Sequence, residues 1–196
     1  MSHQSNRLST VSVGIGLAFL VAAGAAPAQG TSNSSSSTSS MKAGTSASVP
    51  AADKAFVEKA AVGGMAEVQM GKMAQQKGSS DQVKQFGSRM VEDHSKANDE
   101  LKQIASGKGL QLPSAPDAHD QQEMARMQKL SGAEFDRAYM DHMVKDHKKD
   151  IAEFKKQASS GKDPEIKAFA AKTLPTLQEH LKMAEAADAE VKKAKH

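Results

Sequence analysis

The chain of 196 residues contains no cysteine and no tryptophan. The absence of cysteine excludes a disulfide scaffold, a thiolate zinc site, an iron–sulfur cluster and a cysteine nucleophile. Aromatic residues are also scarce, with one tyrosine and six phenylalanines, and the formal net charge is only +3. Nucleic-acid binders use stacking side chains and a strongly basic surface, so we expect no nucleic-acid partner.

The first segment has the pattern of an export signal. Arg7 precedes an apolar run from about Val11 to Ala26, and Ala26-Pro27-Ala28 has the small-x-small pattern of a cleavage site. We therefore predict a signal peptide over residues 1–28, a location in the periplasm or outer envelope, and no membrane span after cleavage. The alternative is a retained membrane anchor, for which the run is slightly short.

A stretch rich in serine and threonine follows over residues 29–50. Such a composition offers almost no apolar surface to bury, so it predicts a flexible linker. The sequence from residue 51 to residue 196 then carries the helical periodicity of a folded domain.

The domain reads as four long helices and one short helix. Turn-forming segments separate them, and no segment alternates with the period of two that is typical of a strand. We predict an all-α fold of two antiparallel hairpins, joined by a connection that carries the short helix. The predicted helices cover about 51–77, 81–106, 118–130, 133–157 and 164 to the lysine-rich end.

Three helix starts carry capping signals. Ser80 is placed to cap the second long helix, and Ser131 with Glu134 has the spacing of a capping box. Asp163 is an expected N-cap, because Pro164 follows at the first helical position.

Each long helix carries one polar, metal-binding type of side chain on its apolar face. At a rise of about 1.5 Å per residue, these side chains lie roughly 18–28 Å along their helices, near the middle of the bundle. A carboxylate and imidazoles that converge between helices are typical of a metal site, with iron and copper as the candidate ions. A hydrogen-bonded structural network without metal is the alternative. The four residues are Glu67, His94, His147 and His180.

The spacing does not fit a di-iron carboxylate centre. Such a centre requires a Glu-x-x-His pair on each of two helices. The residues three before the histidines are instead Val91, Val144 and Leu177.

Three aspartates near these positions have weaker signals. Asp93 and Asp146 precede histidines, and each is expected either to face solvent or to orient an imidazole of a neighbouring helix. Asp136 lies on an inner arc about 16 Å before His147 and is expected to serve a helix dipole or a nearby hydroxyl.

Several stretches of the domain share one recognisable pattern: Gly64-Met65-Ala66-Glu67, Asp93-His94, Phe135 to His147, and Leu174-Pro175 with His180-Leu181. Together they resemble a bacterial family of exported proteins, domain-of-unknown-function family 4142 (DUF4142). The resemblance spans about residues 53–185 and implies a ferritin-like helical bundle, exported to the periplasm or outer envelope and without established activity. Together with the helices placed above, we expect a ferritin-like four-helix bundle with a short extra helix in the crossover. A further likeness, to exported copper-associated ferritin-like proteins, is weakened because those carry a His-His pair where this chain has Asp146-His147.

Three functions are considered on this basis. The first is a non-enzymatic bundle of the cell envelope with a stress-related or binding role. The second is a metal-binding or redox protein that uses the Glu/His site. The third, a hydrolase, is disfavoured because no nucleophile–base pair, elbow motif or phosphate loop is visible. The sequence leaves open the ligand, the partner protein and the oligomeric state, a homodimer included.

Overall fold

The computed structural model describes residues 48–194, which fold into five α-helices and no strands. The all-α class predicted from the sequence is thus confirmed. The predicted signal peptide and nearly all of the predicted linker lie outside the described residues. The helices are α1 (Ala51–Lys77), α2 (Asp81–Gly107), α3 (Ala118–Gln128), α4 (Gly132–Ser160) and α5 (Pro164–Lys193).

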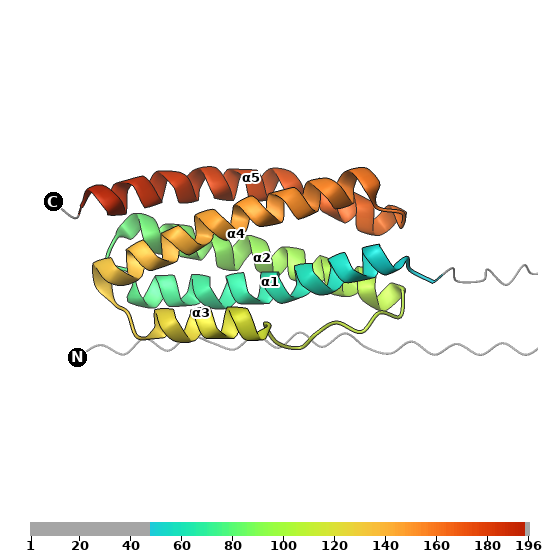
Figure 1. Ribbon diagram of the computed structural model, residues 1–196, viewed down its shortest axis with the longest axis horizontal. Helices are drawn as coiled ribbons and strands as arrows, with labels where there is room; N and C mark the ends of the chain where they lie inside the picture. Colours follow the sequence, from blue (N-terminus) through green and yellow to red (C-terminus); the bar gives the residue numbers. More distant parts are fainter. Residues whose placement is uncertain (1–47, 195–196) are drawn as a thin grey trace, which may run out of the picture. The chain divides into compact units, whose positions relative to one another are not determined.

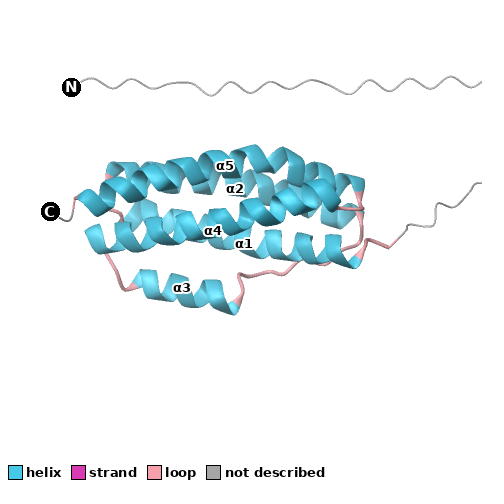
Figure 2. Cartoon of the chain, turned by 45° about the horizontal axis from the view of Figure 1, so that its top comes forward, coloured by secondary structure: helices cyan, strands magenta, loops and turns pink. Residues whose placement is uncertain are grey.

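The four long helices form two antiparallel hairpins, α1–α2 and α4–α5, that lie side by side (Figure 1). Helix α2 packs on α5, and α1 packs on α4. The connection from α2 to α4 runs back along the length of the bundle, and its helix α3 lies against the side formed by α1 and α4 (Figure 2). None of the helices between residues 48 and 194 is both long enough and apolar enough to cross a membrane.

The helix ends follow the sequence signals with small shifts. Helix α1 has the predicted bounds, α2 continues one residue further, and α3 ends two residues earlier. Helix α4 continues three residues beyond its expected end near residue 157 and ends at Ser160, with Gly161 as its C-cap. The N-cap of α5 is as predicted, because the Asp163 carboxylate accepts hydrogen bonds from the backbone N–H groups of Glu165 and Ile166.

The predicted serine caps are wrong. Neither Ser80 nor Ser131 accepts a side-chain capping hydrogen bond from its helix. The backbone donors at the start of α2 are instead satisfied by the carboxylate of Asp136, which lies on α4. This carboxylate accepts hydrogen bonds from the backbone N–H groups of Ser79 and Ser80 and from the Ser79 hydroxyl, at 2.6–3.2 Å.

The α4–α5 turn is braced in the same way by an aspartate of α1. The carboxylate of Asp53 accepts hydrogen bonds from the Gln157 side chain and from the backbone N–H groups of Lys162 and Asp163. Burial alone would raise the pKa of Asp53, but these hydrogen bonds lower it. Each hairpin turn is therefore held by a buried carboxylate of the other hairpin, which fixes the register of the two hairpins.

Replacing Asp136 by alanine is expected to destabilise the protein by about 2–4 kcal/mol, because it removes the charged acceptor of the hydrogen bonds from Ser79 and Ser80 in the α1–α2 turn. Urea unfolding followed by circular dichroism measures this. The matched control is Asp141→Ala, since Asp141 lies on the same helix with exposed ion pairs to Lys145 and Lys192; its loss costs at most about 0.5 kcal/mol. If the two variants lost the same free energy of unfolding, Asp136 would not be supporting the α1–α2 turn.

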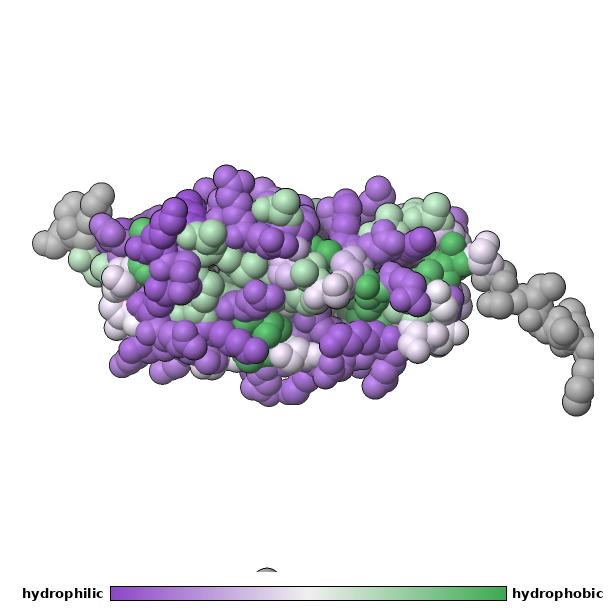
Figure 3. Space-filling model, turned by 90° about the horizontal axis from the view of Figure 1, so that it is seen from below, coloured by the Kyte–Doolittle hydropathy of each residue, from purple (hydrophilic) through white to green (hydrophobic). Residues whose placement is uncertain are grey.

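The apolar core consists of two clusters, one toward each end of the bundle. One contains Met90, Met143 and Ala184, and the other contains Leu101, Ile151 and Leu177. On each of α2, α4 and α5, a histidine stands between the residues of the two clusters. The side of the bundle that carries α3 is covered mainly by hydrophilic side chains (Figure 3).

Candidate metal centre

Three histidines come from three different helices. His94 is on α2, His147 on α4 and His180 on α5, and their exposed fractions are 8%, 0% and 1%. Each follows the inward stripe of its helix, because it is three or four residues from a buried apolar side chain: Met90, Met143 and Leu177 respectively. Helical periodicity thus places the three imidazoles in the core.

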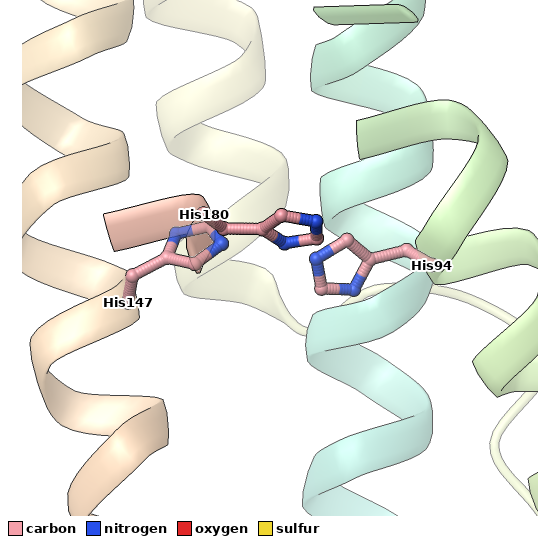
Figure 4. A group of neighbouring side chains, drawn as sticks. All are labelled: His94, His147 and His180. Carbon is pink, nitrogen blue, oxygen red and sulfur yellow. The ribbon is translucent and has the colours of Figure 1, made fainter. Parts of the chain in front are cut away.

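The rings meet at one level of the bundle (Figure 4). Their centroids are 5.3 Å apart for His94 and His180, 5.5 Å for His147 and His180, and 5.9 Å for His94 and His147. One nitrogen from each ring lies within 4.8 Å of the others. Around a tetrahedral ion with metal–nitrogen bonds of about 2.0–2.1 Å, ligand nitrogens are about 3.3 Å apart. Small side-chain rotations would therefore bring all three onto one ion.

His147 presents a free lone pair to the cluster. Its Nδ1 is 2.9 Å from the carbonyl oxygen of Met143, so Nδ1 carries the proton and donates it. Its Nε2 is then an acceptor, and this buried nitrogen has no hydrogen-bond partner.

His180 is held by a carboxylate of another helix. Its Nε2 donates to Oδ2 of Asp93 on α2, at 2.9 Å, and Arg89 also pairs with that aspartate. Its buried Nδ1 has no partner. A carboxylate that fixes the tautomer of a histidine and leaves the other ring nitrogen free is the arrangement found behind metal-ligating histidines.

His94 completes the set, because its Nε2 is also buried without a partner. Each of the three rings thus has one buried nitrogen without a partner, and these nitrogens are Nε2 of His94, Nε2 of His147 and Nδ1 of His180.

Burial keeps the three imidazoles neutral. It lowers the pKa of His94 well below its ordinary value, with a further contribution from the other two histidines. Burial and then the neighbouring His180 lower the pKa of His147 to about 4. Burial also lowers the pKa of His180, although Asp93 opposes that shift. Neutral imidazoles are the form that binds metal.

Glu67 is placed differently from the three histidines. It is 1% exposed on α1, and its Oε1 is 3.8 Å from Nδ1 of His147, the nitrogen that donates to Met143 rather than the unpaired one. Its carboxylate belongs to a group with Asp146 and Asp150 of α4. The structure therefore brings the three imidazoles together and sets Glu67 beside them in a neighbouring group of carboxylates.

The structure gives two further aspartates a place in this region. Asp93 orients the imidazole of His180 on a neighbouring helix, which is one of the two roles expected for it. Asp150 was not singled out, although its spacing of four residues from Asp146 places both on one face of α4. Burial and then Asp146 raise the pKa of Asp150 to about 7.

A cavity of about 410 Å³ reaches this region from the surface. His94 forms part of its wall, together with Asp120, Asp146 and Asp150. An ion or a small ligand could therefore reach the level of the histidines without the bundle opening.

The fold and the site define an all-α bundle with a buried cluster of three histidines. The chain belongs to the family described as domain of unknown function (DUF4142), whose model matches residues 38–187. Comparisons with curated proteins and with solved structures gave no significant match.

Proposed function

We propose that the protein is a metal-binding helical bundle whose three histidines hold one divalent late transition-metal ion. The observation that carries this proposal is that three buried imidazoles from three helices each have one buried nitrogen without a partner and each place a ring nitrogen within 4.8 Å of the other two. Burying a polar group without a partner costs about 1–3 kcal/mol, and three such groups meet here.

A purely structural network explains these nitrogens less well. His147 and His180 already donate their protons to Met143 and Asp93, so both of their remaining nitrogens are acceptors. The ring of His94 could supply one proton at most, and none of the described hydrogen bonds joins the three rings. At least two of the three nitrogens therefore present lone pairs, and such an electron-rich space suits a cation.

The donor set favours particular ions. Imidazole suits zinc, copper, iron and nickel, and for divalent ions the affinity order places copper first, ahead of zinc and iron. Three protein ligands leave a further coordination position, and the cavity beside His94 gives a small molecule access to it. The proposed role is therefore metal binding in the cell envelope, with the predicted signal peptide as the support for that location.

Metal stoichiometry tests this proposal. The full chain, stripped with a chelator and dialysed separately against Cu²⁺ and Zn²⁺, is expected to retain one equivalent of either ion after removal of free metal. The control is His142→Ala, which removes an imidazole of α4 that lies outside the cluster and should retain the equivalent. Substoichiometric metal in the wild type, or loss of metal in the control, would count against the three-histidine site.

A further inference from the structure

Beside the histidines lies a second group of potential ligands that contains oxygen only. Glu67 of α1 and Asp146 and Asp150 of α4 each offer a carboxylate oxygen, and these oxygens lie within 4.8 Å of one another. Asp146 and Asp150 are one helical turn apart, so both point toward the same stretch of α1. The three carboxylates thus face one another across the α1–α4 contact.

Glu67 is the member of this group that the protein alone does not satisfy. It is 1% exposed, and both of its carboxylate oxygens are buried without a hydrogen-bond partner. A buried carboxylate needs a partner, because its desolvation is otherwise costly. Its neighbours are Nδ1 of His147, which lies 3.8 Å away and donates its proton to Met143, and the carboxylates of Asp146 and Asp150. The two carboxylates make a negative charge at this place still less favourable.

The positive charge nearest to the group does not enter it. Lys149 lies 3.8 Å from Asp146, but its side chain is 69% exposed and remains in solvent. Asp120 of α3 adds another negative charge on the same side and lines the same cavity as Asp146 and Asp150. Asp120, Asp146 and Asp150 therefore give the cavity an electronegative wall that solutes can reach, and Glu67 is buried next to it.

We propose that Glu67, Asp146 and Asp150 form a second cation site, separate from the three histidines, that takes a hard divalent ion such as Mn²⁺ or Ca²⁺. Carboxylate oxygens are the ligands that such ions prefer, whereas imidazole suits the later transition metals. The ion supplies the partner that both oxygens of Glu67 lack, and water from the cavity fills its remaining coordination positions. This site goes beyond the proposed function and does not depend on metal binding by the histidines.

Titration of the full chain with Mn²⁺, followed by electron paramagnetic resonance of the free ion, tests this site. We expect one bound Mn²⁺ per chain, competed by Ca²⁺, and a rise in Kd of at least about 100-fold in Asp146→Asn/Asp150→Asn, because two of three charged ligands are lost. Asp99→Asn/Asp141→Asn makes the same change in net charge at two exposed positions and should leave Kd unchanged.

A competition experiment separates the two sites. Protein that has first been equilibrated with one equivalent of Cu²⁺ should still bind Mn²⁺, and this expectation also holds if the histidines take no copper. Displacement of Mn²⁺ by that single equivalent would show one shared site and overturn the proposal. The proposal would also be overturned if the wild type failed to bind Mn²⁺ or if the two double variants had equal Kd values. The partner of Glu67 would then be a proton shared with a neighbouring carboxylate.

Discussion

Replacing His147 by leucine is expected to stabilise the metal-free protein by about 1–3 kcal/mol and to weaken its binding of Cu²⁺ and Zn²⁺ by at least about 100-fold. The gain in stability follows from the removal of a fully buried nitrogen without a partner, with an apolar side chain in its place. The hydrogen bond to the Met143 carbonyl is lost at little cost, since that oxygen also accepts from the backbone of its own helix.

These opposite effects distinguish a metal ligand from a structural histidine. Urea unfolding in the presence of a chelator gives the stability, and competition with a metal indicator gives the affinity. His142→Ala serves again as the control and should change the affinity by less than about threefold. A loss of stability in His147→Leu together with unchanged metal affinity would show that the imidazole is a structural residue.

Acidification is expected to destabilise the metal-free wild type more than His147→Leu, by about 2 kcal/mol between pH 7.5 and pH 5. The pKa of His147 is about 4 in the folded protein and ordinarily about 6.5. Well above pH 6.5 the imidazole of His147 is neutral in both the folded and the unfolded protein. In that range it contributes nothing to the pH dependence of stability. As the pH falls from 6.5 toward 4, the unfolded chain takes up a proton that the folded protein does not, so the free energy of unfolding decreases.

The comparison with His147→Leu isolates the contribution of His147 to the pH dependence of stability. Burial raises the pKa values of Glu67 and Asp150, so these carboxyls act in the opposite direction: they stabilise the folded state when protonated and lose that contribution as the pH rises. Both proteins contain them, and their effect largely cancels in the difference. Parallel stability–pH curves for the two proteins would contradict a neutral, buried His147.

Much of the fold could be predicted because local signals decide it. Glycine and serine turns mark the ends of α1 and α2, and Asp163-Pro164 marks the start of α5. The predicted Ser80 cap was wrong because the donors at the start of α2 are satisfied by Asp136, which lies 56 residues further along the chain from Ser80. Tertiary contacts of this kind leave no trace in local sequence spacing.

The site could be predicted in part. Helical periodicity is enough to place His94, His147 and His180 on inward stripes, and axial rise is enough to place them at similar heights. Neither property gives the direction of a side chain across the bundle. The distinction between Glu67 and the imidazoles depends on which neighbours α1 meets on α4, and the pairing of Asp93 with His180 depends on the contact between α2 and α5.

The most direct test of the central claim is the X-ray absorption spectrum of the full chain loaded with one equivalent of Zn²⁺. Three imidazoles on one ion predict three nitrogen scatterers at about 2.0–2.1 Å, with the multiple scattering that imidazole rings produce. A shell of oxygen atoms alone, or a single imidazole, would contradict the three-histidine site.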